Sequence, residues 1–185
     1  MTKEKKYYRT TIKKERQKIR KTQVEKLSNK IIQKLKKLPE IKKAKKIAIY
    51  LDYNNEVKTR KLKKWLLEQG KKVYVPKMTT NGIVFVQIKE KTQFKKNKVG
   101  IKEPKKGRKT NPKKIELFII PGIAFTKDLH RIGSGKGYYD KFFSKHKIKA
   151  KKIAIAYDFQ IIKKIKKENH DIRMDMIITD KRVIK

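Results

Sequence analysis

The sequence predicts a single α/β domain with helices on both faces of one sheet. Its 185 residues lie within the usual range for one domain. Short runs rich in Ile, Val and Leu alternate with segments whose apolar residues recur every three or four positions. Such an alternation of strands and helices is typical of layered α/β folds. We therefore expect one domain that spans residues 1–185.

The first half of the chain is expected to hold three helices and three strands. A basic helix over about residues 3–20 packs on the domain, and an apolar stripe predicts a second helix, which Pro39 ends. Thr59 can cap the third helix and Gly70 can stop it in the left-handed conformation. The expected ranges are 22–38 and 59–70 for the second and third helices, and 45–51, 72–75 (ended by Pro76) and 83–88 for the strands.

The second half begins with a long connection. Residues 89–114 show weak periodicity and contain several Pro and Gly residues, and connections of this length more often have a function than not. Beyond it we expect strands at 115–120, 152–156 and 175–179, and helices at 138–146 and 160–168.

The charge of the chain is strongly positive. It carries 56 Lys and Arg against 17 Asp and Glu, a formal net charge of +39 at pH 7. Such a field attracts any polyanion and weakens with salt. Only eight of the basic residues are Arg, which base readout favours, and the lysines are scattered along the whole chain. A solvated lysine surface explains this best, with non-specific binding of nucleic acid. The alternative is a basic α/β nucleic-acid-binding protein whose glycine loop contacts a backbone phosphate.

Composition also excludes several classes of protein. The absence of Cys excludes disulfides, thiolate nucleophiles and Cys-ligated metals. No apolar run reaches the roughly 18–20 residues of a membrane span, and the N-terminus lacks the apolar segment of a signal peptide. We expect a cytoplasmic protein that does not contact the membrane.

Residues 121–140 depart from the lysine background. Three of the eight glycines fall between 133 and 137, where main-chain N–H groups can converge on an oxyanion at the start of a helix. Arg131 and Lys136 flank this loop, and Asp140 can hold Mg²⁺ one helical turn later. The pattern is not a Walker P-loop, because Gly137 stands where Ser or Thr is required. The segment predicts an anion cradle; the alternative is a tight turn with the tyrosine pair packed in the core.

The same segment, PGIAFTKDLHRIGSGKGYYD, resembles the signature of the 5-formyltetrahydrofolate cyclo-ligases. The similarity continues through the basic N-terminal helix and the motifs YLDYNNEV, GIKEP, IAIAYDFQ and DIRMD. It implies a monomeric three-layer α/β/α domain with a mostly parallel sheet. It also implies ATP- and Mg²⁺-dependent conversion of 5-formyltetrahydrofolate, with or without a polyglutamate tail, to 5,10-methenyltetrahydrofolate, ADP and phosphate. A further alternative keeps the ATP site but acts on another formylated or carboxylated anion. Ser134 and Thr126 depart from the family pattern, which often has a cation and an Asp there.

The resemblance also implies roles for individual residues. Arg131 and Lys136 are the catalytic candidates, Asp140 and Asp171 the Mg²⁺ ligands, and Leu51 and Glu56 line the pterin pocket. Residues 134–138 border the folate too. The implied ATP contacts are Lys5, Arg9, Arg131, Ile132, Gly133, Ser134, Gly135, Lys136, Gly137, Tyr138 and Tyr139. Purely structural alternatives remain open: Glu56 as a solvated loop acid, Asp171 as a cap or turn residue, and Lys5 and Arg9 as helix-surface charges.

Overall fold

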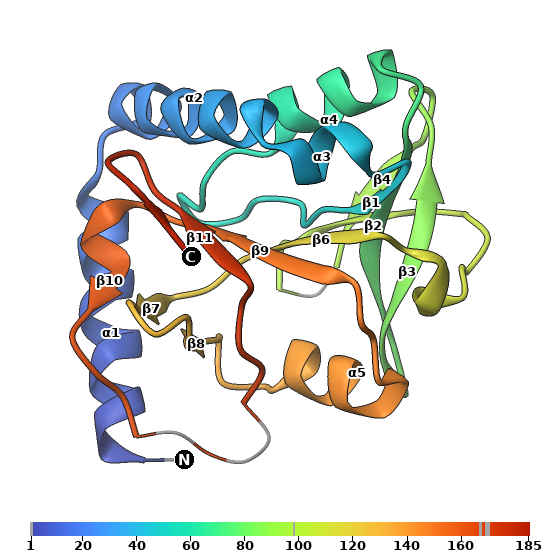
Figure 1. Ribbon diagram of the computed structural model, residues 1–185. Coiled ribbons are helices and arrows are strands. Elements are labelled where there is room, and N and C mark those ends of the chain that lie inside the picture. The colour runs from blue at the N-terminus through green and yellow to red at the C-terminus, as the bar shows by residue number, and fades with distance from the viewer. Residues whose placement is uncertain (1, 98, 167, 169–170) are drawn as a thin grey trace.

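The computed structural model of the chain describes residues 2–97, 99–166, 168 and 171–185. In this part of the chain a seven-stranded sheet has the order β12-β11-β9-β6-β1-β2-β3 (Figure 1). The five inner strands are parallel to one another, and the edge strands β3 and β12 are antiparallel to their neighbours. The expected α/β fold with a mostly parallel sheet is therefore confirmed. The strands are β1 (Lys46–Ala48), β2 (Lys72–Thr79), β3 (Gly82–Ile88), β6 (Leu117–Ile120), β9 (Lys151–Ile155), β11 (Met176–Ile178) and β12 (Val183–Ile184).

Helices cover both faces of this sheet, because alternate strand residues point to opposite faces and both sets are apolar. Ile47, Val73 and Ile119 belong to one core, with side chains of α2 and α4, whereas Ala48, Tyr74 and Phe118 belong to the other, with side chains of α5. Figure 1 shows α2, α3 and α4 on one side of the sheet and α5 on the other. The helices are α1 (Lys3–Lys18), α2 (Lys21–Lys37), α3 (Pro39–Lys43), α4 (Arg60–Glu68) and α5 (Tyr138–His146). None of the helices in the described ranges is long and apolar enough to cross a membrane.

The helix expected over 160–168 is wrong. Residues Asp158–Gln160 form a 3₁₀ turn, η2, and Ile161–Ile162 form a short strand, β10, parallel to β7 (Ala124–Thr126). The buried Gln160 side chain accepts a bond from the Tyr157 N–H and donates to the carbonyls of Gly122 and Ile123. These long-range bonds hold the backbone extended, so tertiary contacts override the local helical pattern.

Two smaller expectations also change. β2 does not end before Pro76 but continues to Thr79, and Pro76 pairs with Phe85 of β3. Since β1 pairs only with residues 72–74, Pro76 lies where β2 has one neighbour and its missing N–H is tolerated. Thr59 makes no side-chain cap; its hydroxyl donates instead to the Tyr50 carbonyl. Gly70 does adopt the expected left-handed conformation, with φ +67°.

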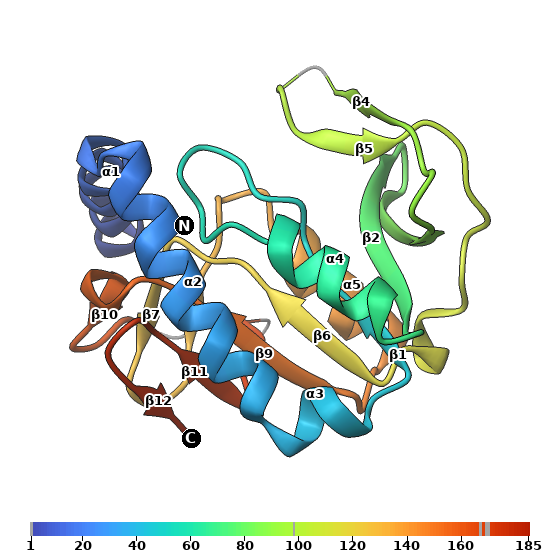
Figure 2. The same ribbon diagram turned by 90° about the horizontal axis from the view of Figure 1, so that it is seen from above.

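Segments outside the main sheet complete the domain. The long connection over 89–114 holds a hairpin of β4 (Phe94–Lys96) and β5 (Lys102–Pro104), followed by the 3₁₀ turn η1 (Pro112–Lys114). β7 also pairs antiparallel with β8 (Arg131–Ile132), which places the glycine loop directly before α5. Figure 2 shows α1 on one side of the molecule and the β4–β5 hairpin on the other.

Candidate active site

A cavity of about 590 Å³ opens at the carboxyl ends of the parallel strands. Tyr50 and Leu51 follow β1, Pro121 and Gly122 follow β6, and all four line the cavity, together with α1, the β4–β5 hairpin and the glycine loop. Parallel α/β sheets bind ligands at this edge, since the loops that leave the strands converge there. The fold therefore places a cavity where the sequence predicts the active site.

The glycine loop forms one wall of this cavity. Gly135 and Gly137 have φ values of +108° and +65°, which L side chains rarely adopt. α5 begins directly after Gly137 and receives no side-chain cap, so its first N–H groups remain available to an anion. Ser134 and the exposed Lys136 line the cavity beside these amides. This arrangement fits the predicted anion cradle.

The tyrosine pair and Ile132 differ in their contact with this cavity. Tyr138 and Tyr139 line it and are half-buried, so they are not closed within the core as the tight-turn alternative requires. Burial raises the pKa of Tyr139, although Arg131 nearby opposes the shift. Ile132 points instead into a small core with Ile12 and Ile123. Ile132 is not among the residues that line the cavity, and its predicted ATP contact stays a prediction.

Arg131 is buried against Asp140. Its Nη2 donates to both carboxylate oxygens at 3.0 Å, and its Nη1 donates to the Pro121 carbonyl at 3.4 Å. The guanidinium also lies over the Tyr139 ring, 5.6 Å from its centroid. Both members of the ion pair line the cavity, so the cation is held in one orientation at its wall.

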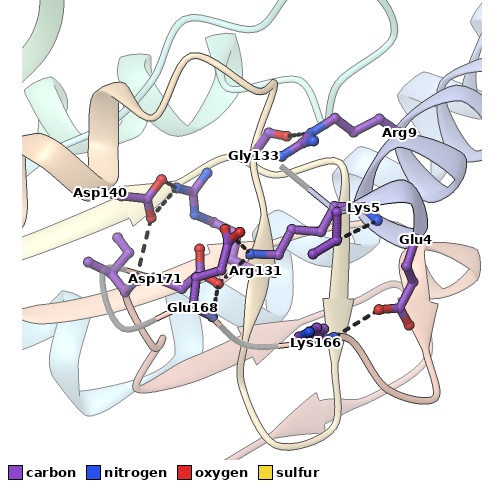
Figure 3. A network of polar contacts seen from close by, with 11 residues as sticks. Glu4, Lys5, Arg9, Arg131, Gly133, Asp140, Lys166, Glu168 and Asp171 are labelled. Atoms are coloured by element: carbon purple, nitrogen blue, oxygen red, sulfur yellow. Dashed lines mark hydrogen bonds and ion pairs between the residues drawn. The ribbon is translucent and has the colours of Figure 1, made fainter.

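The two predicted cations of α1 have different surroundings (Figure 3). Lys5 is buried and its Nζ lies 2.8 Å from Glu168 and 2.5 Å from Asp171. Arg9 donates from Nε to the Gly133 carbonyl at 2.8 Å and thus contacts the glycine loop directly. Neither is a helix-surface charge without partners; Arg9 lies at the predicted nucleotide wall, while Lys5 fixes α1 to the segment that carries Asp171.

The same cavity contains the predicted pterin contacts. Leu51 and Glu56 both line it, and the Glu56 side chain is 19% exposed. Burial raises the pKa of Glu56 to about 7, against the opposing effects of the Arg16 cation and of a hydrogen bond from the Tyr53 N–H. Glu56 is therefore not a fully solvated loop acid. With a pKa of about 7, its protonated and ionised forms are present in similar amounts at neutral pH.

The predicted metal ligands fit Mg²⁺ unequally. Asp140 lines the cavity, whereas Asp171 accepts bonds from Lys5 and from the Glu168 N–H. The described residues offer no group of three or more His, Asp or Glu side chains suited to hold a metal. Mg²⁺ often binds through one or two carboxylates together with substrate phosphates. Asp140 lines the cavity, but both of its carboxylate oxygens already accept from Arg131. That Asp140 and Asp171 bind the metal stays a prediction.

The sequence interpretation missed the part of α1 that lines the cavity. Lys13, Arg16 and Gln17 line the cavity, and Arg16 is 5% exposed. The helical spacing of Lys5, Ile12 and Arg16 places them on one buried stripe. The unusual cationic content of that stripe was the available signal. Residues of the β4–β5 hairpin, including Asn97 and Ile101, also line the cavity and had no signal of their own.

Comparisons of the sequence with known proteins point to one family. The family model described as the 5-formyltetrahydrofolate cyclo-ligase family matches residues 1–180. A probable 5-formyltetrahydrofolate cyclo-ligase of Schizosaccharomyces pombe is 34% identical over 165 residues, which cover 80% of this chain and 81% of that protein. The 5-formyltetrahydrofolate cyclo-ligase of Escherichia coli K12 is 27% identical over 151 residues, with coverage of 78% and 83%.

Solved structures give the same result. The structure of Aquifex aeolicus 5,10-methenyltetrahydrofolate synthetase superposes with a TM-score of 0.87 at 32% identity, and the match covers 97% of this chain and 91% of that one. The match of the family model over nearly the whole sequence and the similar folds lead to one conclusion. The chain belongs to the 5-formyltetrahydrofolate cyclo-ligase family of enzymes.

Proposed function

We propose that the cavity binds ATP at the glycine loop and 5-formyltetrahydrofolate at the Glu56 end, so that the formyl oxygen meets the γ-phosphate between them. The enzyme is a 5-formyltetrahydrofolate cyclo-ligase by its family and its relatives. The observation that carries the placement is one continuous cavity lined by Gly133, Ser134, Lys136 and Gly137 of the glycine loop and by Glu56. An anion cradle at one end and a carboxylate at the other suit a triphosphate and a pterin.

The nucleotide end supplies charge and main-chain donors. The main-chain amides of the glycine loop and of the start of α5 would face the phosphates, beside Lys136 and the Asp140-paired Arg131, which line the cavity. Arg9 steadies the loop through the Gly133 carbonyl. Such a site performs phosphoryl transfer by positioning and by stabilising charge, with no protein nucleophile.

The chemistry follows from the poor leaving ability of a formamide oxygen. That oxygen first takes the γ-phosphoryl group of ATP, and ADP leaves. N10 of the folate then attacks the activated carbon and loses its proton, and the carbon–oxygen bond breaks to release phosphate. Arg131 and Lys136 hold the negative charge that develops on the transferring group, which is the main demand of such a step.

Mg²⁺ is proposed to bind with ATP, held by the phosphates and by Asp140. The metal would neutralise charge on the phosphate oxygens. Asp171 supports the site indirectly, because it binds Lys5 and so anchors α1 beside the glycine loop. We propose that one chain suffices as a monomer, since the described cavity is lined from α1, the glycine loop and the hairpin of a single copy. Light scattering of the purified protein tests that state.

Turnover of the purified protein tests the function. We expect the methenyl chromophore to appear from 5-formyltetrahydrofolate only when both ATP and Mg²⁺ are present. Lys136→Ala should lower the rate by about 10²–10³, the usual cost of removing one transition-state donor. Lys145→Ala removes an exposed lysine from α5 that does not line the cavity, so it should leave the rate unchanged. No turnover by the unaltered protein would refute the proposal.

The nucleic-acid alternative has a separate test. The net charge of +39 alone provides an electrostatic attraction for RNA and DNA. We expect any such binding to disappear at moderate salt and to be unaffected by ATP. Binding that survives moderate salt and competes with ATP would favour that alternative instead.

A further inference from the structure

Arg16 is a buried cation at the pterin end of the cavity whose hydrogen-bonding capacity is largely unused. Its side chain is 6% exposed and lines the cavity. Its Nε is buried without a hydrogen-bond partner, and its nearest charge among the described residues is Glu56, with Nη1 3.8 Å from Oε1. A buried guanidinium with so few partners is costly, because desolvation is not repaid by hydrogen bonds.

The backbone around this pair is fixed rather than loose. The Asn55 side chain donates to the Arg16 and Ile19 carbonyls, at 3.1 and 3.2 Å, and so ties the loop that carries Glu56 to the end of α1. The Tyr53 N–H donates to the second carboxylate oxygen, Oε2, at 3.1 Å. The cavity wall therefore presents a rigid neighbouring pair, a donor from Arg16 and an acceptor from Glu56.

This pair complements one edge of a 4-oxo pterin. Along that edge a ring carbonyl, an N–H and an exocyclic amino group follow one another, so one acceptor stands beside two donors. Glu56 can accept from the two donors as a bidentate partner. The carbonyl then faces a side chain that carries donors and no acceptor, as a guanidinium does.

We propose that Arg16 donates a hydrogen bond to the 4-oxo group of the pterin and thereby selects 4-oxo over 4-amino pterins. The inference rests on the proposed placement of the folate beside Glu56. A 4-amino group would direct its N–H bonds at the guanidinium, so two donors would face each other without an acceptor. Unpaired buried donors of this kind are what give a polar site its discrimination.

The test uses folic acid and aminopterin, which differ in the oxo or amino group at position 4 and, with it, in N3, which is an N–H in folic acid and a bare acceptor in aminopterin. Their dissociation constants are measured by titration calorimetry with the unaltered protein, Arg16→Met, Arg16→Lys and Lys14→Met. We expect the unaltered protein to bind folic acid at least about tenfold more tightly, because a hydrogen bond to a charged group contributes about 1.5–3 kcal/mol. Arg16→Met should reduce the preference to the part that Glu56 provides through N3, and Arg16→Lys, which keeps a charged donor, should retain more of it.

The control and the companion assays separate the possible failures. Lys14→Met removes a charge from the exposed surface of α1, away from the cavity, and should keep the full preference. Arg16→Met should also raise the KM for 5-formyltetrahydrofolate about 10–100-fold while the KM for ATP stays unchanged. Equal binding of the two ligands by the unaltered protein, or a preference that Arg16→Met leaves undiminished, overturns the inference. If the unaltered protein shows no ATP-dependent turnover at all, the proposed function fails instead.

Discussion

Arg131 and Asp140 form a single unit at the wall of the cavity, with Nη2 of the arginine 3.0 Å from each carboxylate oxygen. The side chains are 4% and 14% exposed, so water competes little for this contact. The pair joins the start of β8 to the first turn of α5, which are the two elements that flank the glycine loop. The geometry of the loop and the orientation of its main cation therefore depend on each other.

The first prediction concerns this unit. Arg131→Lys should lower kcat by about 10²–10³, because an ammonium cannot keep both the carboxylate contact and the charge at the transferring phosphoryl group. Asp140→Asn should change kcat in the same direction, since Arg131 then loses its charged partner. Steady-state kinetics with saturating folate and ATP measure both effects. Full activity of both variants would contradict the role given to the pair.

The second prediction concerns the backbone of the glycine loop. Gly135→Ala should weaken ATP binding, because φ +108° strains any residue with a Cβ by roughly 1–2 kcal/mol. Gly82→Ala is a matched control: its φ is +106° and its Cβ would meet nothing within 4 Å, whereas a Cβ at Gly135 would make an ordinary contact with Arg9 Nε at 3.7 Å; Gly82 lies in the β2–β3 turn. Both variants should lose similar stability. Only Gly135→Ala should raise the KM for ATP. A similar rise in Gly82→Ala would show that the effect does not come from a contact between the glycine loop and the nucleotide.

The third prediction concerns the pH dependence of folate binding. Burial raises the pKa of Glu56 to about 7, with Arg16 and Lys58 opposing the shift and Asp52 adding to it. The ionised carboxylate is the form that accepts the pterin N–H bonds, so binding should strengthen as the pH rises through 7. Between pH 6 and 8 the KM for 5-formyltetrahydrofolate should fall about tenfold, which is the change in the ionised fraction.

Glu56→Gln provides the comparison. The amide cannot ionise, so the KM for folate should be higher than in the unaltered protein and independent of pH in this range. The folded-state pKa lies above the ordinary value of 4.5, so Glu56 favours folding most below pH 4.5 and loses that contribution as the pH rises through 7. Glu56→Gln should therefore gain thermal stability relative to the unaltered protein at pH 8 but not at pH 4. If Glu56→Gln kept the same pH dependence of the KM as the unaltered protein, another group would control binding.

The fourth prediction concerns Lys5. Lys5→Met removes the cation between Glu168 and Asp171, and Asp171 is only 10% exposed. Removing a buried ion-pair partner of a largely buried carboxylate should destabilise the fold by about 1–3 kcal/mol and lower the melting temperature by several degrees. Calorimetry measures this loss. The double variant Lys5→Met, Asp171→Asn should recover part of it, and no recovery would mean that the pair does not anchor α1.

The sequence predicted the sheet and most helices because their signals are local. The apolar runs of β6 and β9 and the apolar stripe of α2 have the spacing that burial of a strand or a helix requires, and the structure contains all three elements. The helix prediction for the segment after Gln160 failed because the extended conformation of that segment depends on bonds to Gly122 and Ile123, residues nearly forty positions away. Periodicity carries no information about such contacts.

The site was predictable to the extent that its groups lie close together in the chain. The glycine loop, Arg131 and Asp140 fall within ten residues, and their order already describes an anion cradle. The partners of Lys5 lie more than 160 residues along the chain, and nothing local reveals them. Arg16 was missed for a similar reason: its burial depends on the loop that Asn55 ties to α1.

A crystal structure with a non-hydrolysable ATP analogue, Mg²⁺ and 5-formyltetrahydrofolate tests the central claim most directly. Both ligands should occupy the cavity, with the triphosphate on the amides of residues 133–137 and the pterin against Glu56 and Arg16. The formyl oxygen should then lie within about 3–3.5 Å of the γ-phosphorus, as a near-attack geometry requires. A nucleotide bound elsewhere, or a pterin at the glycine loop, would contradict the account.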